Sequence, residues 1–438
     1  MARGATERSD PRYRCVGIGV GPANLSLASL LHGHSDVRNV FFDSKAEFGW
    51  HEGQQIPGTS LQVSLFKDLV TLAQPTSPFS FLAYLHEQGK IYHFLNARFD
   101  AVPRQEFRNY MRWACERNPN IVLGERVRSV DFDGEFVVAT DRRTVRADNV
   151  VLGIGTRPRL PEQASRDAAT QFHAGEFTAR SGGLGGKRVC VVGGGQSGAE
   201  AVLHLLGRSG AELPRRVSWV SRRANYFPID DSPFTNDFYM PCHSEYFSRL
   251  DRPVREDFNR SNVLSSDGIS ERTLRDLYQR LYALRFIEGA GDLFALFPNR
   301  TVRTVAGADA DGWRLTLAHN DQPHEPEEID ADVVVWATGY RTREAEVLAP
   351  LAGRIEREGG EFRIDGNYAV HWDGPADRNI FVQNRARGQR GLADPNLSLN
   401  AYRSQRIVDR IRGVRSDGQL PSFIEWSAKP RLDLTWEG

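Results

Sequence analysis

Short apolar runs alternate with amphipathic stretches along most of the chain. Apolar residues that recur every three or four positions predict helices, and short uninterrupted apolar runs predict buried strands. Strands that alternate with helices are typical of a parallel sheet with helices on its faces. The predicted strands are 13–17, 40–43, 150–153, 187–192, 217–220 and one within 333–340 that ends in a turn. The predicted helices are 23–31, 105–117, 270–287 and one that opens at 79–84.

The first strand leads into a glycine-rich turn, VGIGVGPAN at 16–24. Gly17, Gly19 and Gly21 allow the backbone to turn tightly and approach a pyrophosphate, which the following helix attracts with its free N–H groups. Pro22 stands where a helix begins, a position that needs no N–H donor. Asp43 ends the next strand, near the spacing expected for a carboxylate that binds a ribose hydroxyl. This order predicts a dinucleotide site rather than a bare glycine turn.

A second turn of the same kind follows the strand at 187–192. It reads VVGGGQSGAE at 191–200, so that a second pyrophosphate is expected there, and two dinucleotides on one chain suggest hydride transfer. Arg222 and Arg223 follow the next strand where NAD enzymes carry an acid, which favours the 2′-phosphate of NADP. Ordinary surface arginines remain the alternative for this pair. The cofactor-binding candidates of this turn are Gly193, Gly195, Gln196, Ser197 and Gly198.

The last predicted strand is followed by Thr338 and Gly339. This short pattern resembles the strand that returns to the flavin domain in flavoproteins with two dinucleotides. The fold class is then α/β, with two Rossmann-like domains, for FAD and NADPH, and a mostly helical insertion. The helix at 270–287 ends this insertion, with an apolar face of Leu274, Leu277, Leu281, Leu284 and Phe286. The predicted boundaries are 1–165 for the first part of the FAD domain, 166–330 for the NADPH domain with its insertion at about 225–290, and 331–438 for the second part of the FAD domain and closure of the substrate site.

Charge and cysteine content argue against several other classes of protein. Lysine plus arginine and aspartate plus glutamate both total 56, a balance that argues against binding to nucleic acid or a membrane surface. We find no stretch of the length of a membrane span, no hydrophobic signal core at the start, and no metal-ligand spacing. The four cysteines form no close pair, which excludes a dithiol reductase and favours a cytoplasmic protein. They are Cys15, Cys115, Cys190 and Cys242.

Two neighbouring segments make the pattern specific. They read LQVSLFKDLV at 61–70 and PTSPFSFL at 75–82. Together with further matches, they closely resemble the flavin-dependent N-hydroxylating monooxygenases of siderophore biosynthesis, the lysine N6-hydroxylase and ornithine N5-hydroxylase family. The further matches run in the family's order along nearly the whole chain, at 17–27, 48–51, 193–198, 220–223, 230–234, 337–341 and 397–399.

The resemblance implies an NADPH- and O2-dependent enzyme. In this family NADPH reduces FAD, O2 forms a C4a-hydroperoxyflavin, and a neutral primary amine attacks the distal peroxide oxygen and leaves as a hydroxylamine. NADP stays bound and shields the intermediate from water. The resemblance also implies a homo-oligomer, a tetramer or a dimer.

The family pattern also implies roles for individual residues. Trp50, His51 and Gln62 would lie against the flavin, with Gln62 as a donor near the peroxide; packing of a loop is its alternative role. Lys67 matches a lysine that pairs with the substrate carboxylate, although a solvated surface lysine is the other interpretation.

Further matches concern the substrate amine. Asn236 matches an asparagine that contacts both the substrate and the nicotinamide ribose, and Ser398 matches a serine beside the amine. Asp267 stands near a second substrate asparagine of the ornithine enzymes and is therefore a candidate contact for an ammonium group.

Two departures from the family pattern bear on the substrate. The Asp267 change and the segment RGQRG at 387–391, where relatives carry Thr-His-Gly, lead away from ornithine. A carboxylate partner at Lys67 favours L-lysine, hydroxylated at N6 for a hydroxamate siderophore. Putrescine, cadaverine, histamine or another biogenic amine and L-ornithine remain open, as does an NADPH oxidase that releases peroxide. A nucleotide-binding regulatory protein without turnover is the alternative from another class.

Overall fold

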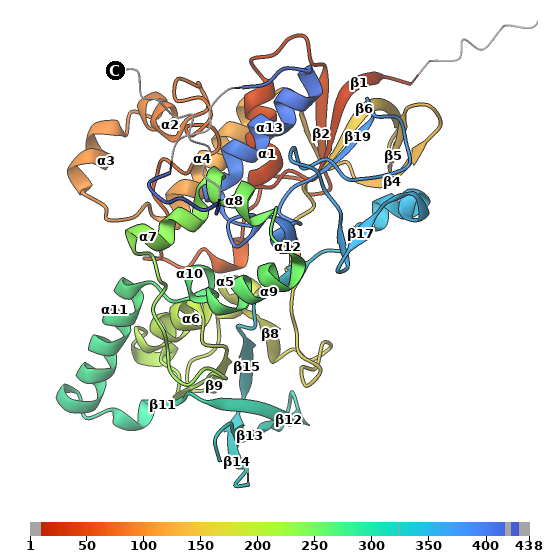
Figure 1. Cartoon of the computed structure of the whole chain (residues 1–438). Coiled ribbons are helices and arrows are strands. Elements are labelled where there is room, and N and C mark those ends of the chain that lie inside the picture. The colour runs from red at the N-terminus through yellow and green to blue at the C-terminus, as the bar shows by residue number, and fades with distance from the viewer. Residues whose placement is uncertain (1–9, 323, 417–421, 429–438) are drawn as a thin grey trace, which may run out of the picture.

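Two sheets organise the chain, one in the upper and one in the lower half of Figure 1. The computed structural model describes residues 10–322, 324–416 and 422–428, so that the outermost parts of the predicted terminal segments, 1–9 and 429–438, lie outside the described residues. Each sheet carries one of the glycine turns at the carboxyl end of a central strand. The α/β class with two dinucleotide-binding folds is confirmed.

The first sheet has the order β3-β2-β1-β6-β5-β4. The strand β6 pairs with β5 along its first half and with β19 along its second half, so that the chain's C-terminal part completes this sheet. Strands β1, β2, β3 and β19 run parallel to their neighbours, whereas β4 and β5 form an antiparallel extension. The bounds are β1 (Arg12–Ile18), β2 (Asn39–Asp43), β3 (Ile121–Leu123), β4 (Val127–Phe132), β5 (Phe136–Thr140), β6 (Thr144–Leu152) and β19 (Asn379–Val382).

Helix α1 (Pro22–Leu31) is the centre of the first domain. All its residues after Pro22 are buried, because α1 lies between the sheet and the helices α4 and α13. The amide of Asn400, at the start of α13, donates to the carbonyl oxygen of Pro22 at 3.0 Å and ties the two ends of the domain together. The helices of this domain are α2 (Phe81–Glu87), α3 (Ile91–Ala97), α4 (Arg104–Arg117), α12 (Arg387–Arg390) and α13 (Asn400–Arg412), with the 3-10 turns η1 (Glu52–Gln54), η7 (Glu346–Arg354) and η8 (Leu397–Leu399) and the hairpin β17 (Arg357–Glu358) and β18 (Glu361–Phe362).

The second sheet is parallel throughout and has the order β11-β10-β9-β15-β8. Helix α6 (Gln196–Leu206) follows its central strand, and an antiparallel meander extends beyond it at the bottom of Figure 1. The sheet strands are β8 (Gln171–His173), β9 (Arg188–Val192), β10 (Arg216–Val220), β11 (Phe294–Phe297) and β15 (Val333–Trp336), and the meander is β12 (Arg300–Ala308), β13 (Gly312–His319) and β14 (Glu327–Ala331).

One strand assignment made from the sequence is wrong. The strand at 333–340 was expected to return to the flavin domain, but β15 pairs with β9 and β8 in the second sheet. The chain returns to the first sheet only at β19, after the ribbon of β7 (Thr156–Pro158) and β16 (Tyr340–Thr342) that connects the two halves. A fully buried apolar strand such as VVVW suits the centre of either parallel sheet, so that its residues do not specify its neighbours.

The expected insertion is mostly helical. Its final helix is shorter than expected, because α11 ends at Tyr282 and continues as the wide turn η5 (Ala283–Ile287). Leu277 and Leu284 are buried as predicted, but Phe286 is 68% exposed and does not belong to the core face. The elements are α7 (Pro233–Asn236), η4 (Asp237–Tyr239), α8 (Pro241–Phe247), α9 (Arg252–Ser261), α10 (Leu264–Asp267) and α11 (Glu271–Tyr282), and the remaining short turns of the domain are η2 (Ala174–Glu176), α5 (Phe177–Arg180), η3 (Gly210–Glu212) and η6 (Gly291–Leu293).

In the part of the chain that the structure describes, every helix is too short or too polar to cross a membrane. The cysteines described there are all free.

Candidate functional site

The first glycine turn has the shape of an anion site. Helix α1 begins without a side-chain cap and without an acidic residue in its first turn, so that its first N–H groups are available to a ligand. Gly19 has a φ of +87°, and a Cβ there would lie 2.6 Å from the carbonyl oxygen of Gly153. A Cβ on Gly21 would meet no atom within 4 Å. The turn is therefore tight on its inner side and open where a pyrophosphate would bind.

The side chain of Asp43 holds the backbone of this turn. Its carboxylate accepts the backbone N–H of Val20 at 2.7 Å and that of Lys45 at 2.8 Å, and only 8% of the residue is exposed. Two backbone hydrogen bonds to the ionised carboxylate hold the loop in place. A contact with a ribose hydroxyl stays a prediction.

A buried polar network behind the first turn was not expected from the sequence. The side-chain amide of Asn24 donates to the carbonyl oxygen of Gly19 at 2.7 Å and accepts from Gln383 at 2.7 Å. Gln383 in turn accepts from Arg403, whose guanidinium is fully buried and forms an ion pair of 3.1 Å with Asp394. The network joins the first turn to the C-terminal loop that carries Ser398. Asparagine, glutamine and arginine so far apart in sequence show no pattern that would have revealed it.

The residues expected against the flavin lie between the two domains. The rings of Trp50 and His51 are 5.1 Å apart, and His51 in turn contacts Tyr340 at 5.8 Å. Gln62 is exposed, and its amide donates to the side chain of Gln196 at 3.2 Å. Gln62 therefore lies where the first domain meets the second turn.

Polar contacts from the first domain also hold the start of α6. Gln54 donates to the hydroxyl of Ser197 at 2.7 Å. Arg104 forms a two-pronged ion pair with Glu200 at 2.7 and 2.8 Å, and both side chains are nearly buried. The amide of Gln196 is engaged by protein groups, since its oxygen also accepts the backbone N–H of Ser270 at 2.8 Å. Sequence reasoning missed Gln54, Arg104 and Glu200, because contacts between domains leave no local pattern.

The second turn opens into a cavity of about 540 Å³. Helix α6 begins, like α1, without a side-chain cap and without an acid in its first turn, so that the cavity ends at an available anion site. Thr338 and Gly339 lie in its wall, which places them beside the second turn. The cofactor candidates that line it are Gly193, Gly195, Gln196, Ser197, Arg222, Arg223, Thr338 and Gly339; the third glycine of the motif, Gly198, is buried in α6.

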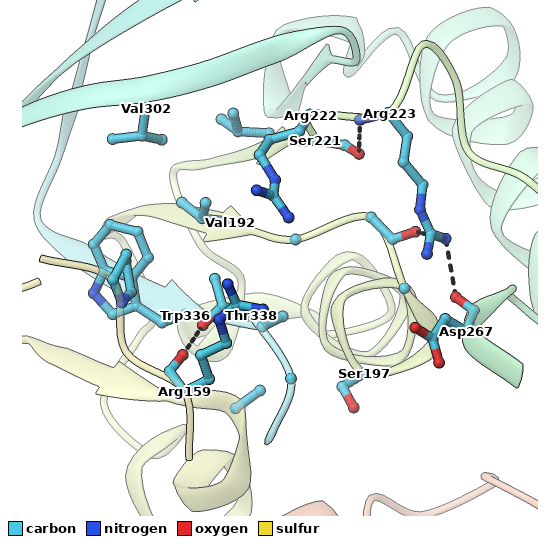
Figure 2. Close-up of a pocket in the computed structure, with 18 of the residues that line it drawn as sticks. Arg159, Val192, Ser197, Ser221, Arg222, Arg223, Asp267, Val302, Trp336 and Thr338 are labelled. Atoms are coloured by element: carbon cyan, nitrogen blue, oxygen red, sulfur yellow. Dashed lines mark hydrogen bonds between the residues drawn. The ribbon is translucent and has the colours of Figure 1, made fainter. Parts of the chain in front are cut away.

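The two predicted phosphate ligands behave differently, as Figure 2 shows. Arg222 points into the cavity, whereas Arg223 donates to the carbonyl oxygens of Gly194 at 3.2 Å and Asp267 at 2.9 Å. Arg159, which the sequence did not single out, also lines the cavity. Neither Arg222 nor Arg159 has a carboxylate within 4 Å among the described residues, so that both guanidinium groups are available to a phosphate.

Lys67 and the residue next to Ser398 are related through Tyr239. The Lys67 ammonium is half-buried, burial lowers its pKa, and it lies 5.8 Å from the centre of the Tyr239 ring. Tyr239 packs in one cluster with Leu399, the neighbour of the buried Ser398. The hydroxyl of Ser398 donates to the side chain of Asn396 at 2.8 Å and keeps its lone pairs for another donor.

The side chains of Asn236 and Asp267 are more exposed than those of Lys67 and Ser398. Asn236 is exposed and donates to the carbonyl oxygen of Asp231 at 2.7 Å. The exposed carboxylate of Asp267 accepts from Ser266 at 2.9 Å and lines the second cavity. No hydrogen bond or ion pair within the described ranges joins either side chain to Lys67.

Comparisons with known proteins agree with this geometry. The chain is 36% identical to the L-lysine N6-monooxygenase of Escherichia coli, over 94% of this chain and 97% of that protein. Its structure is similar to that of the FAD-bound cadaverine monooxygenase of the desferrioxamine pathway of Erwinia amylovora, with a TM-score of 0.86 and 26% identity over 95% of this chain and 100% of that one. It is also similar to the ornithine N-hydroxylase of Kutzneria sp. 744 with reduced FAD, NADP+ and L-ornithine, with a TM-score of 0.84 and 29% identity over 92% of this chain and 99% of that one.

A family model decides the assignment. The model for L-lysine 6-monooxygenase/L-ornithine 5-monooxygenase matches residues 12–342, which is most of the chain. The match confirms the resemblance inferred from the sequence. This chain belongs to the L-lysine 6-monooxygenase/L-ornithine 5-monooxygenase family.

Proposed function

We propose that this enzyme uses FAD, NADPH and O2 to hydroxylate the terminal amine of L-lysine at N6, for the synthesis of a hydroxamate siderophore. The observation that carries the substrate assignment is Lys67, a half-buried cation without a carboxylate partner among the described residues. Such a cation suits an anionic group on the ligand. The similarity to a lysine N6-monooxygenase along nearly the whole chain supports the same substrate.

The two uncapped helix starts are suited to the two cofactors. The N–H groups of α1 would bind the pyrophosphate of FAD, and those of α6 that of NADPH, whose 2′-phosphate Arg222 would bind. When bound, FAD accepts hydride from NADPH and activates O2. The balanced reaction is R–NH2 + O2 + NADPH + H+ → R–NHOH + H2O + NADP+.

The protein must present the amine in its neutral form. An alkyl amine has a pKa of about 10.4, so that deprotonation at pH 7 costs about 4–5 kcal/mol unless the site lowers this pKa. Burial of the amine would do so by penalising its charged form. Ser398 is suited to accept one amine N–H, since its own proton is donated to Asn396, and this would leave the nitrogen lone pair of the amine free to react. Gln62 and Asn236 would contact the flavin and the nicotinamide ribose.

Other substrates define the alternatives. The cadaverine monooxygenase of Erwinia amylovora acts on a diamine, and putrescine, histamine and L-ornithine are further candidates. An NADPH oxidase would share both nucleotide sites but release hydrogen peroxide.

We also propose that the protein is cytoplasmic and forms a homo-oligomer, a dimer or a tetramer. Light scattering on the purified protein would test the oligomeric state.

A product assay tests the reaction. The FAD-loaded enzyme is supplied with NADPH, O2 and each candidate amine, and N–OH compound and hydrogen peroxide are both measured. We expect an amount of N6-hydroxylysine close to the NADPH consumed. Peroxide with every amine and no N–OH product would favour the oxidase.

Replacement of Lys67 tests the substrate carboxylate. Lys67→Ala should raise KM for L-lysine roughly tenfold or more, because an ionic hydrogen bond contributes about 1.5–3 kcal/mol, and should change NADPH oxidation less. Lys187→Ala, at an exposed lysine of the second domain, is the matched control. An unchanged KM in the Lys67 variant would rule out the carboxylate contact.

A further inference from the structure

A second half-buried cation has no assigned role and contacts the residue next to one that Tyr239 holds. It is Arg387, at the start of α12, whose guanidinium donates to the hydroxyl of Ser266 at 3.3 Å. Its backbone carbonyl oxygen accepts from Asn259 of α9 at 3.1 Å, which fixes the start of α12 against the helical insertion. Arg387 is thus held in place by its main chain, while the hydrogen bond of its guanidinium to a described residue goes to a neutral hydroxyl.

Tyr239 connects the two cations. Its ring faces Lys67 at 5.8 Å, and its hydroxyl donates to the carbonyl oxygen of Ser265 at 2.6 Å. The next residue, Ser266, is the one that Arg387 contacts. Burial raises the pKa of Tyr239, and the positive charge of Arg387 is near enough to act against this rise. Lys67 therefore contacts Tyr239, and Arg387 contacts the segment at Ser265 and Ser266 that Tyr239 holds.

Arg387 differs from two arginines of this region that have carboxylate partners. Arg255, on the neighbouring helix α9, pairs with Glu358, and the buried Arg403 pairs with Asp394. Within the ranges that the structure describes, no carboxylate lies within 4 Å of Arg387 or of Lys67. Partial burial of a cation without its counter-ion is unfavourable, and a bound anion would remove this cost.

We propose that Arg387 binds the substrate α-carboxylate together with Lys67, and that this pair selects amino acids over diamines. The inference rests on the proposed N-hydroxylation and specifies its substrate class. The planar guanidinium can bind a carboxylate through two parallel hydrogen bonds, whereas the Lys67 ammonium contributes a point charge. Asp267, which shares Ser266 with Arg387, is suited to the α-ammonium group of the same substrate.

L-lysine and cadaverine form a matched pair of probes, because cadaverine is lysine without the carboxylate. Calorimetry on the FAD-loaded protein gives Kd for each amine, and a separate assay measures the N–OH product. We expect the unmodified enzyme to bind L-lysine at least tenfold more tightly than cadaverine. Arg387→Gln should raise Kd for L-lysine roughly tenfold and change Kd for cadaverine less than about threefold. Arg387→Lys keeps the charge but loses the planar guanidinium. Its Kd for L-lysine should lie between those of the unmodified enzyme and of Arg387→Gln.

Controls keep the result interpretable. Arg260→Gln, at an arginine on α9 whose partner is the exposed Asp257, should change neither Kd. L-lysine methyl ester with the unmodified enzyme should bind at least tenfold more weakly than L-lysine, which tests carboxylate recognition without any substitution.

The outcomes separate the two proposals. Equal weakening of L-lysine and cadaverine by Arg387→Gln, or preferential binding of cadaverine by the unmodified enzyme, would overturn the role of Arg387. Selective weakening of L-lysine without any N–OH product would support that role and contradict the proposed function instead.

Discussion

The two glycine turns share a sequence motif but differ in what surrounds them. Around the first turn, protein groups satisfy one another: Asp43 holds the loop, Asn24 binds its carbonyl oxygen, and Arg403 is buried behind it. The second turn borders a cavity of about 540 Å³ with Arg222 and Arg159 in its wall. Protein groups therefore support the first turn from behind, whereas the second turn borders a cavity.

The difference shows that the motif specifies a pyrophosphate site and its surroundings specify how the site is used. Both helices offer the same free N–H groups to an anion. Among the described residues, the other domain contributes hydrogen bonds to the helix start at the second turn, through Gln54 and Arg104. The start of α6 is thus held by groups from both domains.

The largest effect is expected behind the first turn. Arg403→Met would leave the fully buried Asp394 without its counter-ion, which should lower the free energy of unfolding by about 3–5 kcal/mol. Urea unfolding measures this loss of stability, and the FAD content of the purified variant shows whether the first site is affected. Arg412→Met on the same helix removes an exposed pair with Asp36 and should cost less than about 1 kcal/mol. Equal losses in the two variants would mean that the first site does not depend on its buried network.

A smaller effect is expected at the second turn, and in binding rather than stability. Arg222→Ala should raise KM for NADPH by about 10- to 100-fold and leave that for NADH unchanged, since a charged hydrogen bond contributes about 1.5–3 kcal/mol. Arg223→Ala should affect both coenzymes alike, because its guanidinium holds Gly194 and Asp267. Steady-state kinetics with both coenzymes decides, and a preference of the unmodified enzyme for NADH would refute the assignment of Arg222.

The smallest effect concerns His173, in the wall of the second cavity. Its Nδ1 accepts the N–H of Gly175 at 3.0 Å, so that Nε2 carries the proton and donates to the carbonyl oxygen of Gly339 at 2.9 Å. Burial lowers the pKa of His173. The unfolded chain therefore takes up a proton near pH 6.5, before the folded protein does, and the free energy of unfolding should decrease as the pH falls below about 6.5.

Urea unfolding between pH 5 and pH 7 measures this slope, to which one histidine contributes at most about 1.4 kcal/mol per pH unit. His173→Gln should reduce the slope, whereas His86→Gln, at an exposed position of α2, should not. Identical slopes in all three proteins would mean that folding does not change the pKa of His173, which contradicts the prediction.

The sequence was most informative where chemistry depends on neighbours along the chain. Strands β1, β2 and β9 and the start of α1 at Pro22 were predicted correctly, because glycine spacing, apolar runs and proline act locally. The family was also readable from short motifs, and the family model confirms it. The site residues inferred from the resemblance stay predictions.

The errors and omissions have one physical origin. The strand at 333–336 was assigned to the wrong sheet, and Phe286 to the wrong face, because an apolar residue does not identify what it packs against. Arg403 and Asp394 come together only through the turn of the loop between them.

By itself, the sequence determined two glycine turns, their strands and the family, since each depends on local patterns along the chain. The tertiary structure alone decided which groups surround each turn. Arg104 meets Glu200, Arg223 donates to Asp267, and Arg387 donates to Ser266 because separate segments fold against one another. Contacts between distant segments depend on how the whole core packs, and no short pattern along the chain encodes them.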